Sequence, residues 1–251
     1  MFPPSRRESD TVLEHHPRIT PTAKMLLNNG FDPWRNLNVM DAICCFSCMN
    51  CGAPVLDGIR DARALAVCPA CDSGVINKMA KAKAVFGEIL QWIGAQGFQF
   101  NNLNLRLELR TLSQLVALGV QPESLGVTLT LTEVYNQRFM LRKVNGVAIL
   151  RGLPQELFRL VAVHELGHAW LAVQQAVGLS LWQEEGFCQW LAHRYLLGLG
   201  SATCRHQVRQ IERRNDEIYG VGFRRIANLE KQVGFSRLRK LIVSPLSELP
   251  K

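Results

Sequence analysis

Long uncharged apolar runs are absent from this sequence of 251 residues. A membrane-spanning helix needs about 18 or more such residues, whereas the most apolar long segment, residues 157–182, contains Arg159, His164, Glu165 and His168. The first ten residues, MFPPSRRESD, also lack the apolar stretch of a secretory signal. We therefore expect a cytoplasmic protein that has no membrane partner.

Glycine and proline are not enriched, since the chain contains 19 and 11 of them. This excludes collagen-like and low-complexity classes, and no internal repeat is seen. The hydrophobic fraction of 47% excludes a chain that is disordered throughout. The length suits one large core or two modest domains.

The net charge is +8, and most of the excess lies near the end of the sequence. Residues 205–251 contain eleven Lys and Arg against five Asp and Glu. We interpret this excess as a solvated face of helices, with binding of an acidic partner as the alternative. Nucleic acid is not the partner we expect.

Cysteine is frequent, and six of the eight cysteines lie within residues 44–71. Without an export signal, metal binding or packing is expected rather than disulfides. Two C-x2-C pairs are separated by sixteen residues, a spacing typical of a tetrahedral structural zinc site. The predicted zinc ligands are Cys48, Cys51, Cys68 and Cys71.

Cys45 is a possible substitute in this site, because Cys45 and Cys48 also have the C-x2-C spacing. Gly52 favours Cys48 with Cys51, since a knuckle turn often needs a residue without a Cβ. Cys44 is then spare. The two remaining cysteines, Cys188 and Cys204, are interpreted as small apolar core residues on helices.

Residues 77–150 alternate between helical and strand patterns. Leu at every second position of 102–110 and the alternation in 127–134 predict two strands. Asn145-Gly146 predicts a tight hairpin turn between two further short strands. We expect these strands to form a small, at least partly antiparallel sheet. The expected elements are a helix at 77–96, a short helix at 111–118, and strands at 102–110, 127–134, 139–144 and 147–150.

From Pro154 onward the apolar period is helical. A helix is expected from Pro154 to about Val177 and a second at 184–197, followed by two or three shorter helices with breaks at Gly220, Gly222 and Gly234. A sheet followed by helices is an α+β arrangement.

The sequence HELGH at residues 164–168 carries the clearest chemical signal. His164 and His168 are four positions apart on a helix, so both imidazoles can reach one ion. Glu165 can act as general base on a water at that ion, which is the H-E-x-x-H zinc motif. The alternative is a pair of core histidines whose nitrogens are satisfied by hydrogen bonds.

A catalytic zinc usually has a third protein ligand, and Glu184 and Glu185 follow at a suitable distance. Only one can reach the ion, because adjacent helical residues point about 100° apart. The Glu-Gly-Phe that begins at Glu185 resembles the aminopeptidase-type arrangement, which selects Glu185 as ligand and leaves Glu184 as a supporting or substrate contact. Candidates for stabilising an oxyanion are His206, Tyr219 and His193.

Four segments are similar to the peptidase domain of the plant DA-one growth-regulating peptidases, which are zinc peptidases of the ubiquitin pathway with LIM-type zinc modules upstream. They are ILRGLP at 149–154, HELGHAWL at 164–171, EEGFCQWLAH at 184–193 and YGVGFR at 219–224. The likeness extends over about residues 42–245, and bacterial relatives of simpler build exist. No ubiquitin-interacting motif and no complete tandem LIM pair is seen, so a ubiquitin link rests on the resemblance alone.

Taken together, we expect an α+β zincin of the gluzincin type that binds one catalytic and one structural zinc ion and cleaves a protein or peptide. The expected organisation is an irregular tail at 1–40, a four-cysteine zinc-ribbon module at 41–76 and a metallopeptidase domain at 77–251.

Two other interpretations are weighed against this expectation. One is a non-catalytic zinc scaffold that binds a protein or nucleic acid through the ribbon and the basic helices. The other is a DNA–protein-crosslink protease resembling SprT, in which the ribbon follows the motif and the third ligand is typically His. Here the cysteines precede the motif and the acid is Glu185.

Overall fold

The structure is a computed structural model that describes residues 46–55, 65–100, 103–135 and 139–244. The predicted tail at 1–40, Cys44 and the alternative ligand Cys45 lie outside the described residues. Among the described residues, no helix is both long and apolar enough to cross a membrane.

The described chain is α+β, as expected. Its elements are β1 (Phe46–Ser47), β2 (Pro54–Val55), α1 (Pro69–Asp72), α2 (Met79–Ala95), β3 (Leu107–Arg110), α3 (Leu112–Val116), β4 (Gly126–Tyr135), β5 (Phe139–Leu150), α4 (Gln155–Val173), α5 (Leu181–Leu199), α6 (Ala202–Arg213), α7 (Gly220–Val233) and α8 (Phe235–Leu241).

The larger sheet has the strand order β3-β5-β4 and is mixed. β4 pairs antiparallel with β5 over their full lengths, whereas β3 runs parallel to the last residues of β5. The short β1 and β2 form a separate antiparallel pair next to the cysteines. β4 therefore lies at one edge of the larger sheet.

The predicted hairpin turn at Asn145-Gly146 is wrong, because β5 runs through both residues without turning. Leu129 pairs with Gly146 and Thr130 with Val144, so Asn145 is an extra residue in a β-bulge. Gly146 also allows β3 to come close: a Cβ there would lie 2.4 Å from the carbonyl oxygen of Arg106. The Asn-Gly pair thus serves a bulge and a close strand contact.

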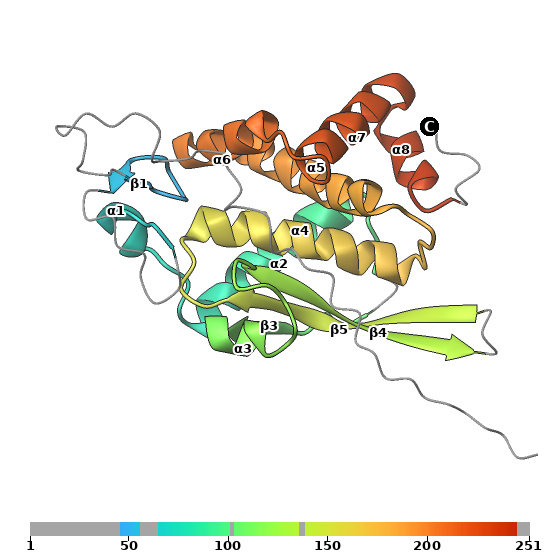
Figure 1. Cartoon of the computed structure of the whole chain (residues 1–251), viewed down its shortest axis with the longest axis horizontal. Coiled ribbons are helices and arrows are strands. Elements are labelled where there is room, and N and C mark those ends of the chain that lie inside the picture. Colours follow the sequence, from blue (N-terminus) through green and yellow to red (C-terminus); the bar gives the residue numbers. More distant parts are fainter. Residues whose placement is uncertain (1–45, 56–64, 101–102, 136–138, 245–251) are drawn as a thin grey trace, which may run out of the picture.

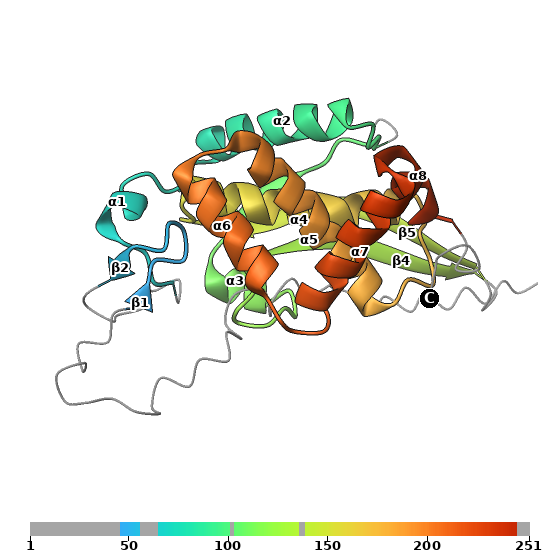
Figure 2. The same ribbon diagram turned by 90° about the horizontal axis from the view of Figure 1, so that it is seen from above.

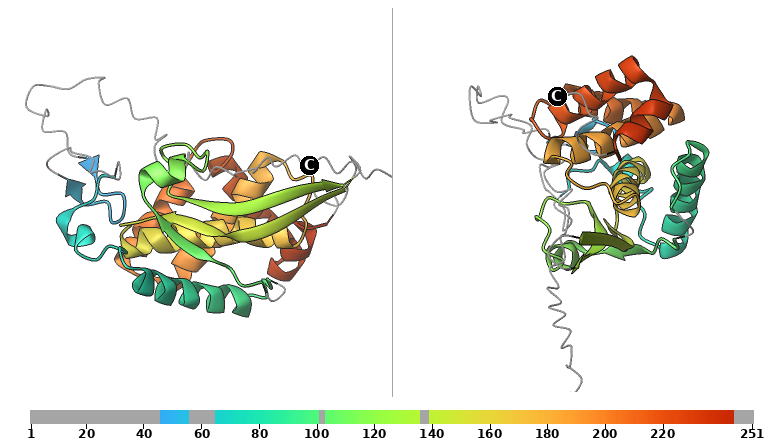
Figure 3. Two further views of the ribbon diagram at one scale, coloured as in Figure 1. Left: turned by 90° about the horizontal axis from the view of Figure 1, so that it is seen from below. Right: turned by 90° about the vertical axis from the view of Figure 1, so that its right-hand side faces the viewer.

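Helix α4 lies in the middle of the molecule, between the sheet and the helices α5 to α7 (Figure 1). The right-hand view in Figure 3 shows these layers end on, with α2 packed beside α4. Every residue from Leu157 to Ala172 is buried. A helix that is buried on all sides has no solvated face, so each polar group on it needs a partner from a neighbouring element.

The helix ends differ from the expected ones by a few residues. Helix α4 ends at Val173, four residues before the predicted end, and Gln175 then adopts a left-handed conformation with φ 53°. Helix α5 begins at Leu181 because Ser180 and Gln183 form a capping box. Gly222 does not break a helix, since it lies within α7, whereas Gly234 does separate α7 from α8.

The cysteine-containing segment lies at the end of the molecule where α4 begins (Figure 2). It is joined to the rest, because Ile76 forms a β-bridge with Leu153 and is fully buried in the main core. Leu65 belongs to the same core. The segment is therefore packed on the helices of the larger part.

Candidate metal centres

Helix α4 brings His164 and His168 together. They lie one helical turn apart, and their Nε2 atoms are separated by 3.1 Å. Both side chains are buried, with exposed fractions of 0% and 1%. Two ring nitrogens that face each other in a dry interior form a natural pair of metal ligands.

Glu185 completes this cluster from helix α5. Its Oε2 lies 3.1 Å from Nε2 of His164 and 3.4 Å from Nε2 of His168. Tetrahedral ligand bonds of about 2.1 Å place neighbouring ligand atoms about 3.4 Å apart, so the three atoms fit one zinc ion. Among the described residues, Oε1 of Glu185 and Nδ1 of His164 are buried without a hydrogen-bond partner.

The electrostatics of Glu185 fit the same interpretation. Burial alone would raise the pKa of this carboxyl, but the charge of His168 and the hydrogen bonds from both histidines lower it to about 2. The pKa of His168 is raised well above its usual value against the effect of burial, because Cys188 and Glu185 lie close to it. The cluster therefore favours a positive charge at its centre, which a divalent cation would supply.

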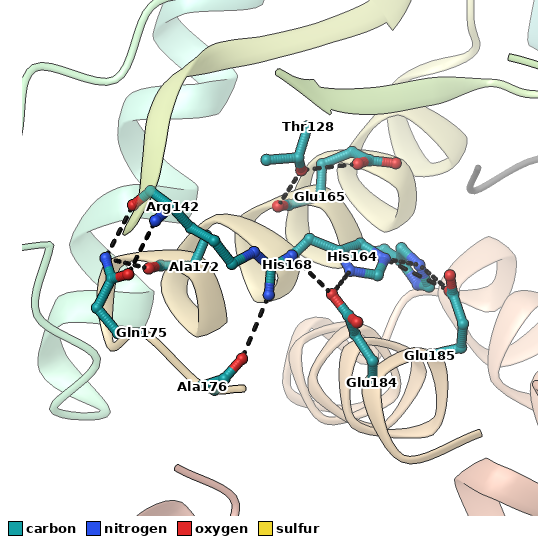
Figure 4. A network of polar contacts seen from close by, with 10 residues as sticks. All are labelled: Thr128, Arg142, His164, Glu165, His168, Ala172, Gln175, Ala176, Glu184 and Glu185. Atoms are coloured by element: carbon teal, nitrogen blue, oxygen red, sulfur yellow. Dashed lines mark hydrogen bonds and ion pairs between the residues drawn. The ribbon is translucent and has the colours of Figure 1, made fainter. Parts of the chain in front are cut away.

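Glu184 takes a supporting position next to the cluster. Its Oε1 lies 3.3 Å from Nδ1 of His168 and 3.3 Å from Nη2 of Arg142 (Figure 4). A carboxylate on the second ring nitrogen fixes the tautomer and the direction of the first one. The adjacent glutamates thus divide as their helical directions require: Glu185 faces both Nε2 atoms and Glu184 faces the outer nitrogen.

Arg142 is a residue that the sequence analysis missed, and Gln175 explains how it is held. Strand β3 pairs only with residues 147–150 of β5, so it does not extend to Arg142. The Gln175 amide binds the Arg142 backbone there instead. Oε1 accepts from the Arg142 N–H at 2.9 Å, and Nε2 donates to the Arg142 carbonyl at 2.8 Å. No local sequence pattern marks such a pairing.

The side chain of Glu165 points toward strand β4. It does not join Glu184 and Glu185, the partners of the two histidines on α5. The hydroxyl of Thr128 lies 2.9 Å from its Oε2 and 2.7 Å from its carbonyl oxygen (Figure 4). Gly126, two residues earlier on the same face, leaves room for the carboxylate, because a Cβ there would lie 3.2 Å from Oε1. Neither β4 residue was predicted, since a Thr in a strand carries no functional signal by itself.

Cys188 is buried, as expected of an apolar core residue, but it also lies at the cluster. Its Sγ and one ring nitrogen each of His164 and His168 lie within 4.8 Å of one another. Burial raises the pKa of this thiol to about 12. Glu185 is the better candidate for the third ligand, because its Oε2 lies 3.1 Å and 3.4 Å from the two Nε2 atoms and burial does not keep it protonated.

The three candidates for stabilising an oxyanion lie in different places. The Tyr219 ring centroid is 6.4 Å from that of His164, and burial and then the charge of Glu185 raise the pKa of its phenol. His206 packs over Gly52 in the cysteine segment. His193 pairs with Glu212 at 3.1 Å and stacks on Phe223. Only Tyr219 among them is beside the cluster.

The second cluster consists of the four predicted cysteines. Their Sγ atoms lie within 4.8 Å of one another, and those of Cys51 and Cys68 are 3.7 Å apart. Four Zn–S bonds of about 2.3 Å would place the sulfurs about 3.8 Å apart. No cysteine among the described residues forms a disulfide. The positions of the four sulfurs therefore fit tetrahedral coordination of one metal ion.

The thiols of this cluster differ: burial raises the pKa of Cys51 and Cys71, whereas that of Cys48 is lowered. Burial would raise the pKa of Cys48, but backbone hydrogen bonds from Cys51, Cys68 and Asn50 lower it to about 7. Backbone donors directed at sulfur are typical of knuckles that hold thiolates.

The comparisons with known proteins point to one family. Residues 111–206 match the family model DA1-like, described as Protein DA1. The chain resembles the DA1 family. The matched residues run from α3 to α6 and include both histidines, Glu165, Glu184 and Glu185, but the four cysteines lie outside them. The match is thus narrower than the predicted likeness over about 42–245.

Individual DA1 relatives from Arabidopsis thaliana match parts of the chain. Protein DA1-related 3 is 39% identical over 75 residues, which is 30% of this chain and 16% of that protein. Protein DA1-related 7 is 30% identical over 133 residues, which is 41% of this chain and 23% of that protein. Protein DA1 is 41% identical over 54 residues, which is 22% of this chain and 10% of that protein. The chain thus matches less than a quarter of each relative, and no solved structure matches it significantly.

Proposed function

We propose that this protein is a zinc-dependent peptidase of the gluzincin type. The observation that carries the proposal is the convergence of His164, His168 and Glu185 within 3.1–3.4 Å, on two packed helices, with Glu165 next to the first ligand. The resemblance to the DA1 family over the same helices supports it.

The chemistry divides between a bound ion and the chain's own groups. A zinc ion held by His164, His168 and Glu185 supplies Lewis acidity toward a peptide carbonyl and toward water. Glu165 takes the proton of the attacking water and returns it to the leaving amine. Glu184 holds His168 in the tautomer that presents Nε2, and Arg142 holds Glu184.

Substrate binding and oxyanion stabilisation have candidates in the same region. The phenol of Tyr219 is a neutral donor beside the cluster, so we assign it to the developing oxyanion. β4 is the edge strand next to Glu165, and an extended peptide added to that edge would pass the general base. The substrate class is therefore an extended segment of protein or peptide.

We assign a second zinc ion, with a structural role, to the four cysteines. A ribbon of this length has too small a core of its own to fold without a structural metal ion. The functional division is a metallopeptidase part that begins at about residue 77 and a four-cysteine module packed on it.

The replacement Glu165→Gln tests the proposed chemistry. The zinc ligands are untouched, so zinc content should stay at the wild-type level, while cleavage of a quenched-fluorescence peptide library should fall at least about a hundredfold. Glu212→Gln, an exposed glutamate on α6, is the matched control and should cleave at the wild-type rate. Cleavage by Glu165→Gln at the wild-type rate, or no cleavage by the wild type, would contradict the proposal.

A further inference from the structure

The loop between the first two cysteine ligands reaches the helix that carries both histidines. Asn50 in this loop is only 2% exposed. Its Nδ2 donates to Sγ of Cys71 at 3.2 Å and, over a longer distance of 3.5 Å, to Oε2 of Glu156, and its Oδ1 accepts from the backbone N–H of Leu157 at 3.1 Å. One amide group therefore contacts a thiol of the cysteine cluster and the first turn of α4.

Helix α4 needs this contact, because it cannot cap itself. Its N-cap residue is Pro154, which has no side-chain oxygen. Leu157 is the third residue of the helix, and an N-cap side chain ordinarily accepts a hydrogen bond from the backbone N–H at this position. Leu157 is fully buried, so water cannot easily replace that acceptor. Asn50, which lies 107 residues earlier in the sequence, supplies the missing oxygen.

The loop is held on its other side by α6. The Gln207 amide donates to the carbonyl oxygens of Met49 and Asn50 at 2.6 Å and 2.7 Å. The ring of His206 covers Gly52, whose φ is +80° and where a Cβ would lie 2.3 Å from the ring. The backbone on both sides of Asn50 is thus fixed, which leaves its side chain little freedom to turn away from α4.

We propose that Asn50 is a positioning residue that couples metal binding by the four cysteines to metal binding by the two histidines. When the cysteines hold an ion, Cys71 is a fixed acceptor for Nδ2 and directs Oδ1 to Leu157. When the ion is lost, the knuckle relaxes, the cap is released and the first turn of α4 frays toward His164. The inference rests on metal binding at both clusters and does not require the protein to cleave peptides.

Zinc affinity of the full-length protein tests the coupling. Competition with a chromophoric zinc chelator would report both clusters, and cobalt(II) spectra would separate the thiolate site from the histidine site. Asn50→Ala should weaken metal binding at the histidine site about fivefold, as expected for the loss of one N-cap. Thr111→Ala is the matched control, since Thr111 caps α3 through the N–H of Gln114, and α3 carries neither a proposed ligand nor a residue that holds the Asn50 loop. It should leave that affinity unchanged.

A double-mutant cycle separates coupling from general destabilisation. Cys68→Ser, in the other knuckle, should weaken the histidine site to a similar extent, and adding it to Asn50→Ala should produce no further loss. Effects that simply add, or an Asn50→Ala protein whose histidine site binds metal as tightly as that of Thr111→Ala, would overturn the inference.

Hydrogen exchange on the wild-type chain provides a measurement without any substitution. Removing metal from the cysteines with a thiol reagent should accelerate exchange of the Leu157 amide, while the Gln114 amide in α3, capped by Thr111, should be unchanged. If the Leu157 amide keeps its protection after the cysteines are emptied, Asn50 does not transmit their state.

Discussion

Thr128 and Glu165 contact each other, and both side chains are fully buried. The Thr128 hydroxyl has one proton and two acceptors within reach, the carboxylate and the carbonyl of Glu165. The bond to Oε2 holds the carboxylate against β4, and the bond to the carbonyl holds the backbone of the same residue. A general base contributes through its position, so a partner that fixes this position belongs to the chemistry.

Thr128→Val tests this role at the residue scale. Valine keeps the shape and the β-branching of threonine but removes the hydroxyl. If the protein is the proposed peptidase, kcat should fall on the order of tenfold with little change in KM, because a hydrogen bond to a charged group is lost. Thr128→Ser should recover most of the rate. A Thr128→Val protein with wild-type kcat would show that β4 does not position Glu165.

At the scale of elements, the distance between α5 and α7 depends on two glycines. A Cβ on Gly186 would lie 2.4 Å from the carbonyl carbon of Gly222, and one on Gly222 would lie 2.5 Å from the carbonyl oxygen of Trp182. These neighbours are backbone atoms and cannot move unless the helices separate. Gly186 directly follows Glu185, so the close helix contact also determines where this proposed ligand lies.

Gly186→Ala should therefore separate α5 from α7. We expect a loss of about 2 kcal/mol in the free energy of unfolding and weaker metal binding at the histidine site. Gly198→Ala, on the same helix, is the control, since a Cβ there meets no atom within 4 Å. It should be neutral or stabilise by about 0.5 kcal/mol through helix propensity. Chemical denaturation of both variants measures the difference, and equal midpoints would contradict the packing argument.

At the scale of the whole molecule, the two proposed metal centres lie at different places along α4. The cysteines pack at its beginning through Asn50, and the histidines lie two and three turns further on. In the proposed assignment, the first centre uses only cysteines and the second uses two histidines and Glu185. The centres should therefore be removable one at a time.

Metal analysis of purified protein checks this expectation. The wild-type chain should bind two zinc ions, and His168→Ala should bind one, because the cysteines remain intact. The remaining zinc of His168→Ala should be released by a thiol reagent. One zinc in the wild type, or two in His168→Ala, would remove the assignment of one centre.

Much of the candidate site was predictable because its signals are local. His164 and His168 share a helix face by their spacing alone, and two C-x2-C pairs each bring two sulfurs together within one turn. The α+β order and most helices followed from apolar periodicity. The hairpin at Asn145-Gly146 was wrong because the same dipeptide also suits a bulge, and only strand pairing distinguishes the two.

The sequence by itself determined the donor types, their spacing along the chain and the helix that carries them, since these depend on neighbours within a few residues. Only the tertiary structure decided that Arg142 supports Glu184 and that Thr128 holds Glu165. It also decided that Asn50 caps α4. These contacts join residues up to 107 positions apart, and because α4 is buried on all sides, its polar groups must take partners from whichever elements pack around it.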